Sequence, residues 1–313
     1  MKDKVKGKIV FMNKPMERTY KLTLRAYFEN AGLRYRGSIE AAQLGAVAFL
    51  LRSLTTRDND LCHTGGTARR DDADPIPAGS ISTKDADLLS ALLKKESNVN
   101  LFLKFNCKFL TDITSYNVIG QITGTEKPDE IIVVAGHLDS WDVSVGAHDG
   151  AGCVHSIEVL RLIKEAGLKP KRTIRAIMFM NEEWGGSGGK EYAQSENRKG
   201  ETHIAAIESD LGGFMPLGFT VKANETQVAS IQKWQYLFED LGMHWIKPGW
   251  GGTDIESLEE YGTVTIGLIP DTQKYFDIHH TKIDVLEQVN PRELEFGAIA
   301  MTILSYVLAQ EGI

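Results

Sequence analysis

The sequence predicts an α/β protein whose larger domain contains a mixed, mostly parallel β-sheet flanked by helices. Three observations lead to this prediction. Continuous apolar runs of about four to eight residues recur along the C-terminal two-thirds of the chain, as is typical of strands buried on both faces. Segments with helical periodicity alternate with these runs. Polar segments rich in histidine and acidic residues follow several runs directly, where ligands collect in open α/β sheets.

Four buried strands are expected in the larger domain, at 131–135, 173–180, 203–207 and 264–269. Helices are expected at 150–166, 226–241 and 291–309. The first helix should end at a glycine, and the last begins with a proline in a favourable first-turn position. The first helix would bury a stripe made of Ile157, Val159, Leu160 and Ile163.

The pattern of strand-like and helical segments in the first 112 residues predicts a smaller α/β domain. Strand-like runs occur at 5–12, 46–51 and 99–105, and helical patterns at 19–31, 38–44 and 83–95. A polar loop runs from Arg69 to Pro77. This domain carries no catalytic constellation, so the chemistry is expected in residues 113–313.

Composition argues against two kinds of partner. The formal net charge is −7, and no basic stripe is present to neutralise phosphates, which argues against nucleic acid. The short clusters Arg69-Arg70 and 169–172 are interpreted as solvated turns. No apolar run reaches the roughly 18 residues that would indicate a membrane span.

The three cysteines, Cys62, Cys107 and Cys153, cannot all pair, and none has zinc-motif spacing to another. Cys153 is expected in the core, as is usual for a free cysteine. The sequence neither supports nor excludes a Cys62–Cys107 disulfide. Cysteine usage therefore does not define the redox compartment.

Five short segments of the larger domain contain residue types that suit a zinc site. Zinc hydrolases hold the metal with neutral imidazoles and carboxylates and leave one position for water. A two-zinc site also needs a shared carboxylate and an acid/base group that is not a ligand. The segments are 136–140, 147–150, 181–183, 208–210 and 279–281, and they supply His137, Asp149, Glu183, Asp210 and His280, with Glu182 spare.

The positions of these segments favour convergence, because four of them follow predicted strands. Side chains beyond the carboxyl ends of parallel strands meet at one edge of the sheet. A lone His or Asp there is commonly a helix cap or a loop residue, and the Glu182-Glu183 pair could be a solvated acidic turn. Adjacent carboxylates repel each other unless a cation or proton lies between them. The complementary types of all five segments favour the metal site.

These segments resemble the co-catalytic zinc exopeptidase family, and within it the carboxypeptidase Q-like peptidases. The resemblance extends from about residue 116 to the C-terminus. It is carried by Gly-His-Leu-Asp-Ser-Trp-Asp-Val at 136–143, Glu-Ser-Asp at 208–210, Gly-Thr-Asp-Ile at 252–255 and Tyr-Phe-Asp-Ile-His-His at 275–280. The resemblance implies the zinc exopeptidase fold and two zinc ions per chain.

The resemblance also implies a division of the ligands. His137 and Asp210 would bind one zinc, Glu183 and His280 the other, and Asp149 would bridge the two.

Two further residues receive roles from the resemblance. Glu182 would be the general base that takes a proton from the bridging water and passes it to the leaving amine. Asp139 would lie behind His137 and fix the tautomer and orientation of its ring. Of the two adjacent histidines, His280 matches the ligand and His279 does not.

The chain departs from the family pattern in the stretch 147–152, which is a residue short. The family usually has a second Asp or Asn after the bridging Asp, whereas Gly150 follows Asp149 here. Asp149 is the one carboxylate in the stretch, so we keep it as the bridge. His148 is a substitute ligand in principle, although a loop histidine is the favoured interpretation.

The resemblance implies that residues 1–112 form a protease-associated insert and that an N-terminal peptidase segment is missing. Residues 1–7 are charged and do not have the pattern of a signal peptide. The family is typically exported, so a secreted or periplasmic location is expected, and a homodimer is left open.

The expected function is a zinc-dependent exopeptidase for dipeptides or short peptides with free termini. The side chain and the terminus that it prefers are not predicted. The aromatic and glycine-rich stretch 245–254 either lines a substrate pocket or is a loop with packed tryptophans. Two alternatives remain open: a glutaminyl-cyclase-like or deacylase enzyme on the same scaffold, and a non-catalytic truncated homologue.

Overall fold

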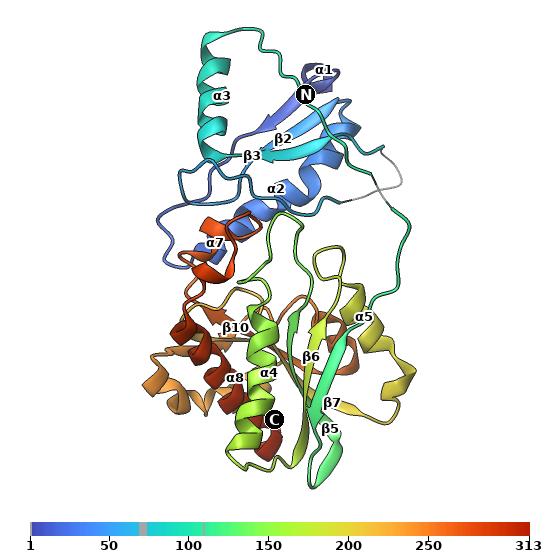
Figure 1. The fold of residues 1–313 in the computed structure, drawn as a ribbon, viewed down its shortest axis with the longest axis vertical. Coiled ribbons are helices and arrows are strands. Elements are labelled where there is room, and N and C mark those ends of the chain that lie inside the picture. Colours follow the sequence, from blue (N-terminus) through green and yellow to red (C-terminus); the bar gives the residue numbers. More distant parts are fainter. Residues whose placement is uncertain (1, 69–73, 109) are drawn as a thin grey trace. The chain divides into compact units, whose positions relative to one another are not determined.

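The structure, a computed structural model, describes residues 2–68, 74–108 and 110–313. The predicted turn at Arg69-Arg70 and part of the polar loop that follows lie outside the described residues. The chain divides into two compact units (Figure 1). The first comprises Met1–Thr114, Trp141–Ser144 and Phe276–Ile283, and the second Ser115–Ser140, Val145–Tyr275 and Asp284–Ile313. Each unit has its own β-sheet.

The first unit contains a three-stranded parallel sheet in the order β1-β2-β3 and helices before and after it in sequence. Its elements are α1 (Lys2–Val5), β1 (Ile9–Met12), α2 (Thr23–Gln43), β2 (Ala48–Arg52), β3 (Ala78–Ile81) and α3 (Thr83–Lys95). The central strand β2 is buried along its whole length. A Cβ atom at Gly37 of α2 would lie 2.4 Å from Cζ of Phe49 in β2, so the glycine permits close packing of helix on strand.

Three predictions for this unit were wrong. The first strand begins at Ile9 because residues 2–5 form a helical turn. Residues 19–31 and 38–44 belong to one helix, α2, which continues through Gly32 and Gly37. Residues 99–105 form no strand; β2 pairs with β1 on one side and with β3 on the other. Phe102 in this run is 89% exposed. The helix predicted at 83–95 is confirmed with the same bounds.

The second unit contains a seven-stranded sheet in the order β4-β6-β5-β7-β10-β8-β9. The strands β6, β5, β7 and β10 are parallel neighbours. At the two sides of this group, β4 runs antiparallel to β6 and β8 runs antiparallel to β10, while β9 pairs in parallel with β8. The bounds are β4 (Val118–Ile122), β5 (Lys127–His137), β6 (Arg172–Phe179), β7 (Thr202–Glu208), β8 (Pro216–Lys222), β9 (Trp245–Pro248) and β10 (Val264–Pro270). This mixed, mostly parallel sheet with helices on its faces confirms the predicted fold class.

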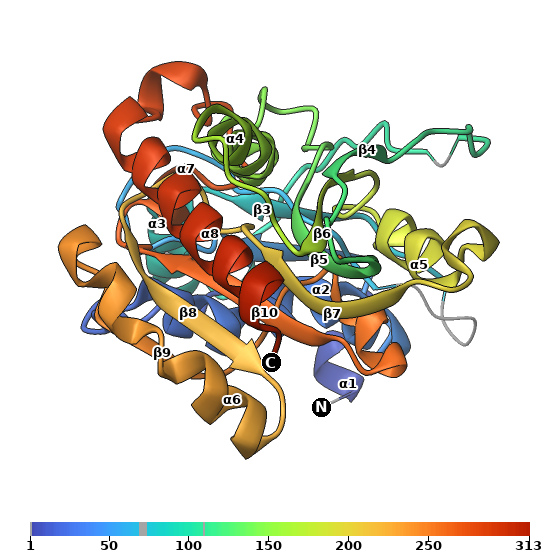
Figure 2. The same ribbon diagram turned by 90° about the horizontal axis from the view of Figure 1, so that it is seen from below.

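The helices cover both faces of this sheet, as Figures 1 and 2 show. In β5, Ile132 and Val134 point into the core under α4 and α8, whereas Ile131 and Val133 point into the core near α5 and η3. The helical elements are α4 (Ala151–Glu165), α5 (Ser187–Gln194), η1 (Glu196–Arg198), α6 (Glu225–Gln232), η2 (Gln235–Leu241), η3 (Glu256–Tyr261), α7 (Tyr275–Ile278), η4 (Leu286–Gln288) and α8 (Pro291–Glu311). Strands buried on both faces explain the continuous apolar runs.

Several details of the second unit differ from prediction. The helix expected at 226–241 is divided into α6 and the 3₁₀ segment η2. The expected loop 245–254 begins with a strand, β9. Ile157 on α4 is 51% exposed and does not belong to the buried stripe, whereas Val159 and Ile163 do. None of the helices in the described residues is long and apolar enough to cross a membrane.

The cysteines are free thiols, and the Cys62–Cys107 disulfide is not formed. Cys62 and Cys107 are exposed. Cys153 is buried, as predicted, and its thiol donates to the His137 carbonyl oxygen at 2.9 Å.

Candidate metal centre

The ends of three neighbouring strands in the second unit carry most of the predicted site. His137 is the last residue of β5, and the register pairs it with Phe179, the last residue of β6. Ala135 of β5 pairs with Glu208, the last residue of β7. The Glu182-Glu183 pair and Asp210 follow β6 and β7 within four residues. These side chains therefore leave the sheet at the same edge.

His137 is held between two oxygen atoms. Its Nδ1–H donates to the main-chain oxygen of Asp139 at 2.8 Å, and its Nε2 lies 3.0 Å from Oδ1 of Asp210. Burial opposes the charged ring, but the hydrogen bond to Asp210 and the charges of Asp210, Glu182 and Asp149 outweigh it and raise the pKa of His137 well above its ordinary value. The raised pKa favours the positively charged imidazole, because carboxylates surround it.

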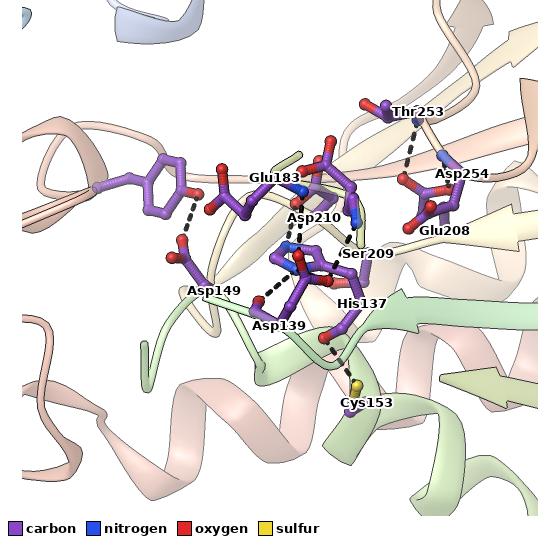
Figure 3. A network of polar contacts seen from close by, with 12 residues as sticks. His137, Asp139, Asp149, Cys153, Glu183, Glu208, Ser209, Asp210, Thr253 and Asp254 are labelled. Atoms are coloured by element: carbon purple, nitrogen blue, oxygen red, sulfur yellow. Dashed lines mark hydrogen bonds and ion pairs between the residues drawn. The ribbon is translucent and has the colours of Figure 1, made fainter. Parts of the chain in front are cut away.

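Asp139 does lie behind His137, but its carboxylate has another partner. The contact that orients the ring is made by the main-chain oxygen, whereas the nearer carboxylate oxygen is 3.9 Å from Nδ1. The carboxylate instead accepts the backbone N–H of Glu182 at 3.0 Å and that of Glu183 at 3.2 Å (Figure 3). A single residue, Asp139, therefore bonds both His137 and the segment that follows β6.

The acidic segment after β6 is also held from its other side. Asn181 adopts a left-handed conformation with φ of 72°, which asparagine tolerates better than most residues. Its amide donates to Oγ of Ser187 at 2.7 Å. Asn117 accepts the N–H of Met180 at 2.9 Å and donates to the carbonyl oxygen of Gly188 at 2.9 Å. The turn that carries the Glu pair is thus tied to its surroundings at several points.

The carboxyl group of Glu182 lies in an excess of negative charge. Burial and the charges of Asp210, Glu183 and Asp254 raise its pKa to about 9, while His137 acts in the opposite direction. Among the described residues, no lysine or arginine is a main cause of this shift. A bound cation would relieve the repulsion among these acids.

Asp149 lies in the turn before α4 and is oriented by Tyr275. The phenol donates to Oδ1 of Asp149 at 3.2 Å (Figure 3). Burial and the charges of Asp149, Asp210 and Glu183 raise the pKa of Tyr275 well above its ordinary value, so the hydroxyl remains a donor.

His148, the alternative ligand, uses both ring nitrogens elsewhere. Nδ1 accepts the N–H of Gly213 at 3.2 Å, and Nε2–H donates to the carbonyl oxygen of Gln288 at 3.3 Å. Its ring stacks on Phe214 with 4.1 Å between centroids. These contacts agree with a loop histidine rather than a ligand.

Glu208 and Asp254 form an acidic pair beside the site that sequence reasoning missed. The Glu208 carboxylate accepts the backbone N–H groups of Thr253 and Asp254 at 2.9 and 3.0 Å (Figure 3). It also accepts the backbone N–H of Ile255 at 3.0 Å. Asp254 is buried, and burial together with the charges of Asp210 and Asp139 raises its pKa to about 7, against the effect of His137. These hydrogen bonds join segments 208–210 and 252–255. Both segments carry the family resemblance, and this was the sequence signal that could have pointed to the pair.

His280 belongs to the first unit and is bonded there to Thr64. Its Nδ1–H donates to the carbonyl oxygen of Thr64 at 3.2 Å, and its own carbonyl oxygen accepts the N–H of Thr64 at 3.1 Å. The ring stacks on His279 with 3.6 Å between centroids. A histidine that binds zinc commonly donates its other ring N–H to a carbonyl oxygen, and the Nδ1 bond of His280 to Thr64 fits this pattern. That role stays a prediction.

Zinc fits the donor set of the second unit. Imidazole nitrogen and carboxylate oxygen are ordinary zinc ligands, and a ligating histidine typically donates its other N–H to a carbonyl or carboxylate. His137 has this arrangement, with Nδ1 bonded to a carbonyl oxygen and Nε2 facing a carboxylate. The surplus of negative charge around Glu182 points to the same class of occupant.

The chain is similar to characterised peptidases along nearly its whole length. The model of peptidase family M28 matches residues 117–307. Carboxypeptidase Q from Xenopus laevis is 36% identical over 309 residues, and that from Homo sapiens 33% identical over 305 residues. Both matches cover 97% of this chain and 63% of the relative, so the chain spans less than two-thirds of their length.

Solved structures show the same likeness. A peptidase M28 precursor from Shewanella amazonensis superposes with a TM-score of 0.88 at 31% identity, covering 99% of this chain and 70% of that one. BSAP, a zinc aminopeptidase from Bacillus subtilis, superposes with a TM-score of 0.65 at 20% identity, covering 100% and 72%, and shows a shared fold. Together with the family match, these similarities show that the chain belongs to peptidase family M28.

Proposed function

We propose that the chain is a zinc-dependent exopeptidase that hydrolyses dipeptides or short peptides with free termini. The observation that carries this proposal is the His137 imidazole, held between the Asp139 carbonyl oxygen and Asp210 inside a cluster of carboxylates at the ends of adjacent strands. The names of the relatives, carboxypeptidase Q and zinc aminopeptidase, support the same reaction class.

Two zinc ions are proposed, with the ligands divided as the resemblance implies. His137 and Asp210 would hold one ion, Glu183 and His280 the other, and Asp149 would be shared. Zinc bound by such ligands polarises a carbonyl group and lowers the pKa of water toward about 7.

The side chains of the protein supply positioning and proton transfer. A carboxylate oxygen of Glu182 takes a proton from the attacking water and delivers it to the nitrogen of the leaving amine. Asp139 keeps Glu182 in place through the backbone N–H bond of 3.0 Å. The same carboxylate accepts the backbone N–H of Glu183 at 3.2 Å, so one residue positions both the base and a proposed ligand. This coupling suits a reaction in which base and water must stay aligned.

Other expectations accompany this proposal. We assign the first unit to a protease-associated insert domain on the basis of the family resemblance. Export from the cell stays a prediction that rests on that resemblance alone, and the oligomeric state is not predicted.

The test combines metal analysis with a hydrolysis assay. Protein purified without chelator is analysed for zinc and assayed with dipeptides, with and without chelator. About two zinc ions and chelator-sensitive cleavage are expected. Glu182→Gln should retain zinc and lose activity by about 10²–10⁴-fold, as removal of a general base does. Glu191→Gln is the matched control, because Glu191 is an exposed glutamate on α5.

Each alternative has its own outcome. Activity retained in Glu182→Gln would contradict the assignment of the base. One zinc per chain with cyclised glutamine products would favour the cyclase alternative. Absence of both zinc and cleavage would favour a non-catalytic homologue.

A further inference from the structure

The turn that presents Asp149 has a glycine at each end, Gly146 and Gly150. Residues 147–150 form a turn between the end of β5 and α4. Gly146 precedes it with φ of 63°, and Gly150, the N-cap of α4, has no side chain to cap the helix. Within the turn, the N–H of Gly150 bonds the carbonyl oxygen of Gly146 at 2.8 Å. The position of Asp149 therefore depends on contacts from elsewhere in the chain.

Asp284 supplies such contacts to three consecutive residues. Its Oδ1 accepts the N–H of His148 at 2.8 Å, and its Oδ2 lies 3.4 Å from the N–H of Asp149. Its carbonyl oxygen accepts the N–H of Ala147 at 3.3 Å. Asp284 is 1% exposed, and hydrogen bonds from backbone N–H to a buried carboxylate are among the stronger ones. Asp284 thus bonds the backbone of three of the four residues in the turn.

Tyr275 acts on the side chain rather than the backbone. Its hydroxyl bonds Oδ1 of Asp149 at 3.2 Å, and its ring meets Phe214 edge-on at 6.3 Å. Phe214 stacks in turn on His148, the neighbour of Asp149. Because the phenol fixes one carboxylate oxygen, it also sets the direction of the other.

We propose that Tyr275 and Asp284 are positioning residues that hold the shortened turn so that the Asp149 carboxylate is presented to the metal centre. This inference rests on the proposed function, since it assigns a purpose to Asp149 as a ligand. The two residues have complementary roles, because Asp284 sets the backbone of the turn and Tyr275 sets the carboxylate. Both lie more than 120 residues from Asp149 in sequence, at separations of 126 and 135.

The first test measures zinc affinity by competition with a chromogenic chelator. Tyr275→Phe removes only the hydroxyl and keeps the ring packed on Phe214, so the fold should survive. Zinc affinity is expected to fall about 10–100-fold, the usual effect of removing a partner of a metal ligand. The matched control is Tyr192→Phe, which removes another buried hydroxyl, bonded to Arg175 at 2.9 Å and His203 at 2.7 Å. The control should lose stability but keep the zinc affinity of the wild type.

The second test is independent of metal. Hydrogen exchange is measured on the zinc-free protein for the peptide covering residues 145–152. Asp284→Asn should speed exchange there, because the backbone N–H groups of the turn lose a carboxylate acceptor. Tyr275→Phe should leave the exchange of that peptide nearly unchanged. Asp271→Asn is the control, since Asp271 also accepts a backbone N–H, that of Gln273, in an exposed loop.

The outcomes separate the inference from the proposed function. A zinc-binding, active wild type together with an unchanged affinity in Tyr275→Phe would overturn the role of Tyr275 and leave the function intact. Unchanged exchange in Asp284→Asn would overturn the role of Asp284. A wild type that binds no zinc would overturn the proposed function and, with it, the positioning of a metal ligand. Weaker zinc binding together with faster exchange in the respective variants would support the inference.

Discussion

The carboxylate of Asp139 accepts the backbone N–H of Glu182 at 3.0 Å. Because the carbonyl oxygen of the same residue bonds His137, the segments after β5 and β6 are locked together by a single aspartate. The resemblance implied that Asp139 orients the ring of His137, and the structure adds a second contact, from the Asp139 carboxylate to the segment that carries the proposed base.

The first prediction follows from this link. Asp139→Asn keeps the main-chain carbonyl contact to His137. The backbone N–H of either Glu182 or Glu183 would then face the amide NH₂ group, which cannot accept a hydrogen bond. We expect kcat to fall by about 10–100-fold, the range for loss of a residue that supports a metal site. Steady-state kinetics on a dipeptide checks this result. Asp129→Asn, an exposed position at the other end of β5, should behave as wild type. A wild-type kcat in Asp139→Asn would contradict the positioning role.

Zinc should stabilise the folded protein. Binding to the native state alone adds about 2.7 kcal/mol to the free energy of unfolding when free zinc is 100 times its Kd. Denaturant unfolding with and without chelator measures this difference. His137→Gln removes one proposed ligand, so the added stability should largely disappear in that variant. An equal response to zinc in both proteins would exclude His137 as a ligand.

A methyl group at Gly152 should displace the backbone next to two proposed ligands, His137 and Asp210. A Cβ atom there would lie 1.9 Å from the carbonyl oxygen of Ser209 and 3.0 Å from Cα of Gly136, the neighbours of Asp210 and His137. Gly152→Ala should therefore lower the free energy of unfolding by about 1–3 kcal/mol or more and reduce activity. Gly167→Ala is the control, because its Cβ meets nothing within 4 Å and only φ of 65° is unfavourable. That variant should lose about 1 kcal/mol and keep its activity.

Stability should fall as the pH is lowered from 6.5 toward 4. Burial and the charge of Arg198 lower the pKa of His203 to about 4 from 6.5, against the effect of Glu201. Between these values the unfolded chain binds a proton that the folded chain does not, so acid favours unfolding. The expected contribution is about 2 kcal/mol at pH 5. Urea unfolding of wild type and His203→Gln at pH 7 and pH 5 isolates it. The same pH dependence in both proteins would contradict the prediction.

Sequence patterns predicted the second unit well because its strands are buried on both faces. The runs 131–135 and 264–269 must be apolar throughout to lie in such a sheet, and they do so as β5 and β10. Sequence patterns were less successful in the first unit, where contacts between segments distant in sequence determine which runs form strands and helices. The run 99–105 has strand-like composition, yet it pairs with no strand of the small sheet, which in the described residues contains β1, β2 and β3. Gly37 looks like a helix breaker, yet close packing on Phe49 requires it.

For the candidate site, the sequence by itself determined the residue types and their places after strands, because parallel strands end at one edge whatever else the chain does. Only the tertiary structure decided which polar atoms meet. The bonds from Tyr275 and Asp284 to the Asp149 turn, and from the Asp139 carboxylate to Glu182, join positions 43 to 136 residues apart. A hydrogen bond requires its two atoms within about 3 Å and in line, and local sequence patterns do not specify such distances between remote segments.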